Sequence, residues 1–341
     1  MRPTGRRVAG SPGMDRKVSC EAGVTRAIRR AAPRRAGGMP AALVYVRAMR
    51  LGLASIVATV VAAVACTAGS TPPRAPGAAS APTSTGAPVS AAVPGVRPLA
   101  IGETFTLDSR VLGERRVINV YLPPDYATSG QRYPVLYMPD GGIKEDFPHI
   151  SGLIDVSIKN AVIRPFLVVG IENTERRRDL VGPTAVANER AAAPHAGGSD
   201  RFRQFLRDEL KPQIAARYRT TPESALVGES LAGLFVVETL VVDPTLFDSY
   251  IAVDPSVWWN EQAVVRGAAA RFDAWSVAPK RLYVATGDLP EMQAGVAILL
   301  AAVRDHHPAG LDVHDDPLPA EHHNTIFPVA ALRGFRALFA P

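Results

Sequence analysis

Two kinds of hydrophobic periodicity run through the chain from about residue 98 onward. Residues 104–124, TFTLDSRVLGERRVINVYLPP, alternate between the two sides of an extended chain in two short runs, which predicts an antiparallel hairpin. The runs YPVLYMPDGG (133–142) and PFLVVGIEN (165–173) are nearly all apolar and end in glycine or polar residues. Such runs are typical of strands buried on both faces of a parallel sheet.

Helical periodicity alternates with strands through the second half of the chain. In residues 200–218 the apolar side chains fall on one helical face, and Pro212 is expected to bend that helix. Strands are predicted at 225–227, 249–256, 281–288 and 311–319, and helices at 231–242, 260–275, 291–307 and 325–339. This repeated alternation predicts an α/β fold with a mostly parallel sheet that helices cover on both faces.

Charge divides the 341-residue chain into a basic leader and a mildly acidic remainder. The formal net charge is +6, but residues 1–66 hold 12 of the 38 basic residues and only 2 of the 32 acidic ones. The other 26 basic and 30 acidic residues give the chain from residue 67 onward a net charge of −4. Because the basic character belongs to the leader, it indicates no nucleic-acid partner.

The leader ends in an apparent export signal. Residues 49–66, MRLGLASIVATVVAAVAC, have a basic start, an apolar stretch and small residues before a cysteine. The stretch is short for a transmembrane helix. Cys66 stands where a bacterial lipobox carries its lipidated cysteine, so a lipid-anchored protein and a cleaved, secreted protein are both open. Met39 and Met49 both fit as translation starts.

The composition of the remaining chain predicts a flexible tether followed by one folded domain. Residues 67–97 are Ala, Pro, Ser, Thr and Gly with almost no large apolar side chains, so they cannot bury enough surface to fold. The folded domain is expected at 98–341, a usual size for one α/β enzyme. Cys20 is the only other cysteine and lies in the leader, so no internal disulfide is expected after its removal.

A serine stands at the strand-to-helix turn of ALVGESLAGLFVVETL (225–240). Ser230 could cap the following helix, as serine often does. However, Gly228 and the small Ala232 on either side allow the sharp turn of a G-x-S-x-G nucleophile elbow, here with alanine in the fifth position. The pattern makes Ser230 a candidate nucleophile if a base and an acid follow.

Partners for such a serine are expected where other strands of the sheet end. Asp288 and Glu291 follow the strand RLYVATG, and His322 and His323 precede the last helix. The chain order is then Ser, acid, His, as in α/β-hydrolases. A histidine takes the serine proton, and a carboxylate fixes the histidine tautomer.

Longer segments resemble the esterase family of α/β-hydrolases that includes siderophore esterases and, more distantly, the mycolyltransferases. The segments are YPVLYMPDGG, FLRDELKPQIAARYRTTPESALVGESLAGLF, PTLFDSYIAVDPSVWWN and LPAEHHNTIFP, and the likeness spans 98–341. It implies the α/β-hydrolase fold and no cofactor. The family's E-x-H-x-S/T segment matches Glu321, His323 and Thr325, which selects His323 as the base. By analogy with the mycolyltransferases we expect Glu291 as the acid, with Asp288 as the alternative.

The same resemblance places the oxyanion hole and suggests a pocket. Family members use the N–H after the nucleophile and the N–H after an Asp-Gly pair, which correspond to Leu231 and Gly142. A tetrahedral oxyanion needs two fixed donors of this kind. Trp258 and Trp259 follow the strand at 249–256, so they are candidates for a substrate-binding wall or for core packing.

The predicted function is an exported serine esterase that acts on a small-molecule ester through an acyl-enzyme. An acyltransferase would use the same residues, and a non-catalytic surface-binding protein would keep only the scaffold. The acidic and histidine residues at 314–316 and 321–323 have no recognised metal-ligand spacing, so no metal is expected. Neither the ester itself nor the oligomeric state follows from the sequence.

Overall fold

The computed structural model describes residues 99–341. The predicted leader, export signal and tether, with Cys66, lie outside the described residues. Within 99–341, no helix combines the length and apolar character needed to cross a membrane.

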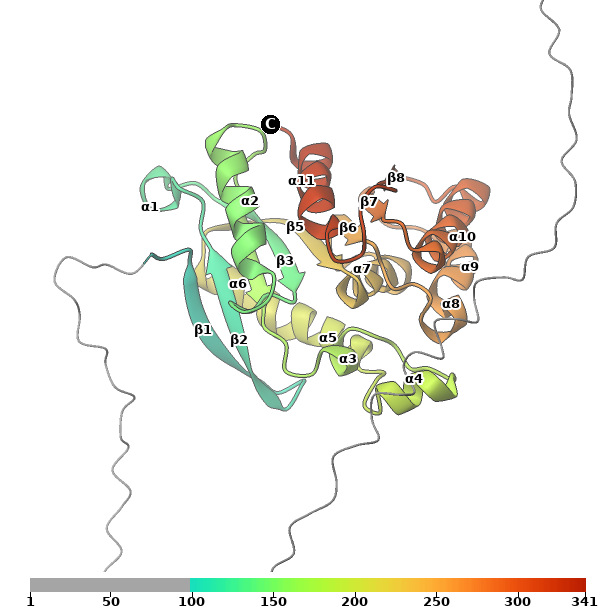
Figure 1. The fold of residues 1–341 in the computed structure, drawn as a ribbon. Helices are drawn as coiled ribbons and strands as arrows, with labels where there is room; N and C mark the ends of the chain where they lie inside the picture. The colour runs from blue at the N-terminus through green and yellow to red at the C-terminus, as the bar shows by residue number, and fades with distance from the viewer. Residues whose placement is uncertain (1–98) are drawn as a thin grey trace, which may run out of the picture. The chain divides into compact units, whose positions relative to one another are not determined.

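Eight strands form one sheet in the order β1-β2-β4-β3-β5-β6-β7-β8 (Figure 1). The first two strands and β4 pair antiparallel, and every pairing from β4 across to β8 is parallel. The prediction of a mostly parallel sheet that begins with an antiparallel hairpin is therefore confirmed. The strands are β1 (Glu103–Ser109), β2 (Glu114–Tyr121), β3 (Tyr133–Pro139), β4 (Leu167–Ile171), β5 (Thr220–Glu229), β6 (Ser249–Val253), β7 (Lys280–Thr286) and β8 (Leu311–Pro317).

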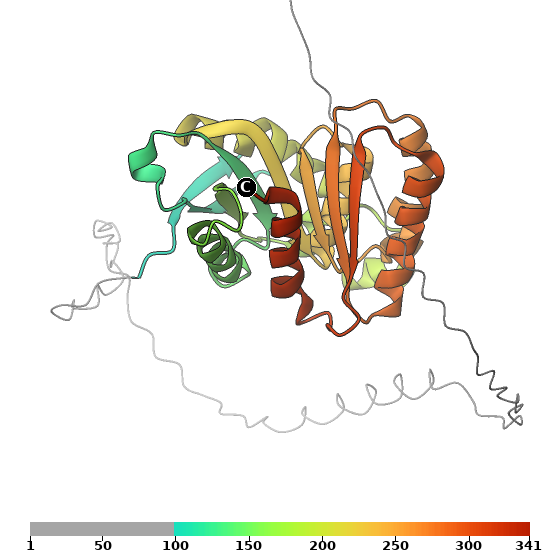
Figure 2. The ribbon, with the colours of Figure 1, turned by 90° about the horizontal axis from the view of Figure 1, so that it is seen from above.

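Helices cover both faces of the sheet. Helix α2 (Phe147–Lys159) and helix α11 (Ile326–Phe339) lie side by side on one face (Figures 1 and 2). The other face carries α5 (Ser199–Phe205), the π-helix η2 (Leu206–Leu210), α6 (Lys211–Arg217), α7 (Leu231–Val242) and α10 (Pro290–His306). Shorter helices complete the set: α1 (Tyr126–Ser129), α3 (Arg176–Asp179), α4 (Ala187–Ala192), α8 (Trp259–Arg266) and α9 (Ala268–Asp273).

The apolar strands separate two hydrophobic cores. Along β5, Leu226 packs into the core beneath α7, whereas Ala225 and Val227 pack into the core beneath α2 and α11. Because successive side chains of a strand point to opposite faces, a strand that serves two cores must be apolar at every position. This explains the uninterrupted apolar runs, although β5 extends beyond its apolar centre at both ends, from Thr220 to Glu229.

Candidate active site

The serine of the elbow lies between β5 and α7 in a strained backbone conformation. Ser230 has φ 60° and ψ −119°, and its hydroxyl makes no capping bond to the helix. A Cβ at position 228 would lie 2.6 Å from the Ala232 carbonyl oxygen, so only glycine fits there. The Ser230 N–H donates to the Val253 carbonyl at 3.1 Å, which ties the turn to the end of β6. The side chain is thus presented away from the helix backbone.

A histidine and a buried aspartate complete a hydrogen-bonded chain with this serine. His323, in the loop before α11, has Nε2 3.0 Å from Ser230 Oγ and Nδ1 2.5 Å from Asp254 Oδ2. Asp254 is fully buried, and its other oxygen accepts the Gly287 N–H at 2.9 Å. The bond from Asp254 is the main reason that the pKa of His323 is raised. The geometry is that of a base aligned on a nucleophile by a carboxylate.

The carboxylate bonded to His323 is that of Asp254, and it is neither of the two carboxylates predicted from the sequence. Asp288 is exposed and pairs with Nδ1 of His322 at 2.6 Å, and Glu291 is an exposed residue in the first turn of α10. Asp254 instead follows β6, which lies next to β5 in the sheet. Its position at the neighbouring strand end brings the carboxylate beneath the imidazole, while the turn after β7 directs Asp288 to the other histidine.

The two predicted oxyanion donors have different surroundings. The N–H of Leu231 belongs to the first turn of α7, where a helix offers no backbone acceptor. The N–H of Gly142 donates to Oε2 of Glu145 at 2.7 Å, and Glu145 also accepts from the Asn173 amide at 3.0 Å. The N–H of Leu231 is thus available to a ligand, whereas the N–H of Gly142 must release Glu145 before it can donate to a ligand.

An arginine that the sequence analysis did not single out supports the loop after β3. Arg176 of α3 makes two bonds of 2.7 Å to the carboxylate of Asp140, which is buried and has φ 56°. Its guanidinium also approaches the Glu229 carbonyl oxygen at 3.4 Å. The residue therefore links the end of β3 to the end of β5. Arg176 lies in ERRRDL, which carries no helical or strand periodicity that would have marked it.

A cavity of about 380 Å³ opens over the serine and histidine. Trp258 is half-buried and borders it. Trp259 also borders it, but this residue is 5% exposed and its indole N–H donates to the Gly182 carbonyl at 2.9 Å. The accessible aromatic wall is therefore Trp258, and Trp259 is chiefly a core residue. Arg177, Leu231 and Met292 also line this cavity.

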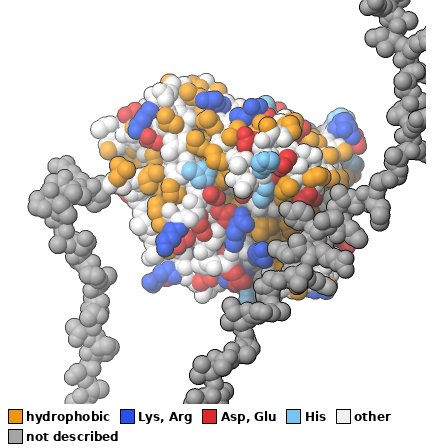
Figure 3. Space-filling model, viewed as in Figure 1, with side chains coloured by type: hydrophobic (Ala, Val, Ile, Leu, Met, Phe, Trp, Pro, Cys, Tyr) orange, Lys and Arg blue, Asp and Glu red, His pale blue; other side chains and the backbone are white. Residues whose placement is uncertain are grey.

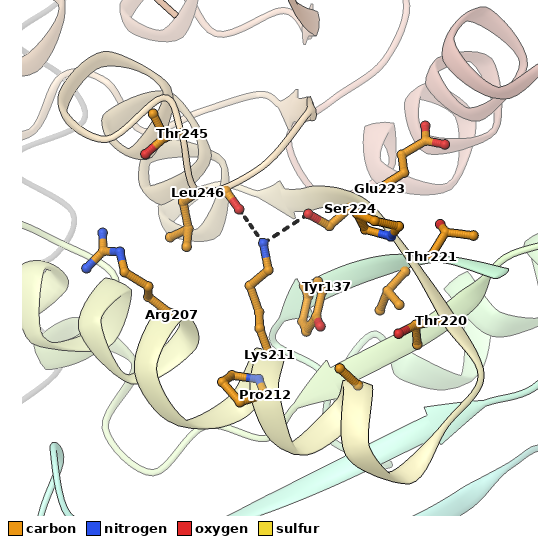
Figure 4. A pocket seen from close by; sticks show the side chains of 13 residues that line it. Tyr137, Arg207, Lys211, Pro212, Thr220, Thr221, Glu223, Ser224, Thr245 and Leu246 are labelled. Atoms are coloured by element: carbon orange, nitrogen blue, oxygen red, sulfur yellow. Dashed lines mark hydrogen bonds between the residues drawn. The ribbon is translucent and has the colours of Figure 1, made fainter. Parts of the chain in front are cut away.

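A second cavity, of about 410 Å³, lies at the opposite ends of the strands (Figure 4). It is lined by the start of β5 and by Lys211, whose Nζ donates to Ser224 Oγ at 3.0 Å and to the Leu246 carbonyl. Burial lowers the pKa of Lys211 to about 8. No residue of the Ser230 hydrogen-bonded chain borders this cavity, so we assign the catalytic candidate to the first one.

Acidic and basic side chains are interspersed on the face shown in Figure 3. Across residues 99–341, no group of three or more His, Cys, Asp or Glu residues is arranged to hold a metal ion.

Comparison with known proteins places this chain in a family. A family model described as "Putative esterase" matches residues 109–323. Among curated proteins, a ferri-bacillibactin esterase of Bacillus subtilis is 32% identical over 171 residues, which cover 45% of this chain and 58% of that protein. A siderophore triacetylfusarinine C esterase of Aspergillus fumigatus is 30% identical over 189 residues, covering 51% and 62%. The chain thus spans about three fifths of the length of these relatives.

Solved structures agree with the sequence comparison. An IroE-like serine hydrolase from Shewanella oneidensis superposes with a TM-score of 0.65 and 28% identity, covering 70% of this chain and 80% of that one. A siderophore hydrolase from Aspergillus nidulans, 23% identical with a TM-score of 0.62, covers 73% and 98% and supports the fold alone. The predicted α/β-hydrolase fold is confirmed, and the chain belongs to the esterase family.

Proposed function

We propose that this protein hydrolyses a small-molecule carboxylic ester through an acyl-enzyme on Ser230. One observation carries the proposal: the hydrogen-bonded chain from Ser230 through His323 to the buried carboxylate of Asp254. A serine hydroxyl attacks an ester only when a base removes its proton, and a buried carboxylate stabilises the imidazolium that results. A surface-binding protein on this scaffold would have no need to keep that chain intact.

The proposed reaction proceeds in two halves. The proton of Ser230 Oγ passes to Nε2 of His323 as the oxygen attacks the ester carbonyl. The imidazolium then gives the proton to the departing alkoxide, which leaves as an alcohol and completes the acyl-enzyme. In the second half a water molecule attacks the acyl carbon and His323 takes its proton. The imidazolium then returns this proton to Ser230 Oγ as the bond to the acyl carbon breaks and the acid is released.

Backbone N–H groups are proposed to hold the tetrahedral oxyanion in both halves. The N–H of Leu231 follows the nucleophile directly and lies at the start of α7, where the helix favours negative charge. The N–H of Gly142 is the second donor that we propose, after release from Glu145.

The substrate class that we propose is an ester of the kind found in siderophores. The curated relatives are named as a ferri-bacillibactin esterase and a siderophore triacetylfusarinine C esterase. The cavity beside Ser230 supports a planar, anionic substrate, because it combines the half-buried Trp258 ring with the exposed guanidinium of Arg177. Arg177 gives one N–H to the Ala192 carbonyl and keeps others for a ligand.

Export from the cytoplasm is part of the proposal and rests on residues 49–66. If Cys66 is lipidated, Cys66→Ser abolishes lipid labelling and releases the protein from the membrane fraction. Membrane attachment that survives this substitution with no loss of lipid labelling would rule out the lipid anchor at Cys66.

The deciding experiment combines active-site labelling with turnover. A fluorophosphonate probe should label the wild-type protein on Ser230, and Ser230→Ala should abolish both labelling and hydrolysis of p-nitrophenyl esters. Addition of an acceptor alcohol to the same assay separates hydrolysis from acyl transfer, because a transferase forms a new ester. Labelling that persists in Ser230→Ala would refute the proposed nucleophile.

A further inference from the structure

A second carboxylate faces the catalytic nitrogen of His323. Glu229 is the last residue of β5 and directly precedes the nucleophile. Its Oε1 lies 3.4 Å from Nε2 of His323, the same nitrogen that lies 3.0 Å from Ser230 Oγ. The Glu229 side chain is only 16% exposed. Two polar groups therefore compete for one nitrogen.

The charges around Glu229 come from four elements of the fold. Beside His323, it faces the guanidinium of Arg176 on α3, and it also experiences the carboxylates of Asp140 after β3 and Asp146 before α2. Burial is the largest influence and raises the pKa of Glu229 to about 7, against the attraction of His323 and Arg176. The carboxyl group is thus placed to change its charge near neutral pH, beside the imidazole.

We propose that Glu229 is a positioning residue that shares a proton with His323 and so sets the pH at which the imidazole becomes a free base. The proposal rests on the proposed function, since it assigns His323 as the base. Carboxylate and imidazole at this separation form one coupled system, whose titration steps belong to the pair.

The location of the shared proton explains the effect on activity. With Nδ1–H bonded to Asp254, a neutral His323 presents a lone pair at Nε2. A protonated Glu229 can donate its O–H to that lone pair in place of the serine, and an ionised Glu229 stabilises a proton on Nε2. In either arrangement one proton lies between Glu229 and Nε2 of His323, the nitrogen that must accept the proton of Ser230. Activity therefore rises only as the pair loses this last proton.

The sign and size of the expected shift follow from the charge of Glu229. An anion near the imidazole favours its protonated form and raises its pKa, so removal of the anion lowers the pKa. At 3.4 Å, even the dielectric constant of bulk water gives a shift of about one pH unit. The acid limb of the pH–rate profile should therefore move down by about one pH unit.

The test compares Glu229→Gln with the wild-type protein across pH 5 to 9. We expect the acid limb of kcat/KM for a p-nitrophenyl ester to move down by about one pH unit, with the high-pH plateau kept within about threefold. The matched control is Asp288→Asn, which removes a carboxylate from His322 and should leave the limb in place. A uniform loss of activity with an unchanged limb would mean that Glu229 only supports the turn.

A second readout separates this proposal from the proposed function. The titration of the His323 ring nitrogens by NMR reports its pKa without any turnover, and it should fall in Glu229→Gln. A wild-type protein that shows this coupling but no fluorophosphonate labelling would refute the proposed function and still support the shared proton. If Glu229→Gln does not fold, two coupled steps in the wild-type His323 titration support the proposal, and a single independent step overturns it.

Discussion

Replacement of Asp254 with asparagine changes the charge of the acid while keeping its shape. Asp254 accepts Nδ1–H of His323 with one oxygen and the Gly287 N–H with the other. In the variant, the amide oxygen stays with the buried Gly287 N–H, because that donor has no other partner in the site, and the NH₂ group then faces Nδ1. Two donors cannot face each other, so the imidazole must place its proton on Nε2. That tautomer cannot accept the proton of Ser230.

The expected loss is about 10⁴ in kcat, the usual size for an acid-to-amide change in such a triad. At about 1.36 kcal/mol for each factor of ten, this corresponds to about 5.4 kcal/mol of transition-state stabilisation. Turnover of a short-chain p-nitrophenyl ester measures the effect, and thermal unfolding checks that the nearly isosteric variant remains folded. Labelling of Ser230 by the fluorophosphonate should slow in parallel, because it depends on the same base.

Two control variants test whether the loss is specific to Asp254. Asp288→Asn and Glu291→Gln remove carboxylates that do not touch His323, so each should keep turnover within about threefold of the wild type. The reasoning fails if Asp254→Asn retains more than a tenth of wild-type turnover, or if Asp288→Asn loses as much as Asp254→Asn.

Three further predictions follow from other parts of the domain. Trp258→Ala should raise KM for aromatic esters with a smaller change in kcat, whereas Trp259→Ala should mainly lower the melting temperature; equal kinetic effects would contradict this. Lys211, with its pKa lowered to about 8 by burial, should react with trinitrobenzenesulfonate at pH 8 faster than the exposed Lys159, as peptide mapping would show (Figure 4). Gly228→Ala should cost about 1–3 kcal/mol of unfolding free energy through its 2.6 Å clash, measured by urea denaturation.

The central strands were predictable because their side chains pack into both cores. The run SYIAVDPS became β6 (Ser249–Val253), whose five residues are all buried. Helices were less well defined. The single helix expected at 200–218 contains the π-turn η2 just before Pro212. A proline has no N–H to give to the carbonyl four residues earlier, and a wider turn accommodates that loss, but the hydrophobic pattern is the same for either kind of helix.

The acid was the part of the site that the sequence left unresolved. Asp254, Asp288 and Glu291 all lie between Ser230 and His323, so each satisfies the chain order Ser, acid, His. What separates them is which strand lies beside β5, and periodicity carries no information about strand order. The end of β6 adjoins the elbow, and β7 is one strand further away. Proximity across the sheet therefore favours Asp254.

Backbone strain at the site is a further feature that the hydrophobic periodicity of the sequence does not predict. Among the non-glycine residues with positive φ are Asp140, Ser230 and Asp254, at 56°, 60° and 39°. They follow β3, β5 and β6, which are adjacent in the sheet. Each such residue costs on the order of 1 kcal/mol or more, and strain of this kind persists where surrounding contacts hold it. Here the contacts are the Arg176 pair with Asp140, the Ser230 N–H bond to β6 and the Gly287 N–H bond to Asp254. At these three adjacent strand ends the backbone leaves the β conformation, and hydrophobic periodicity does not reveal which polar residue does so.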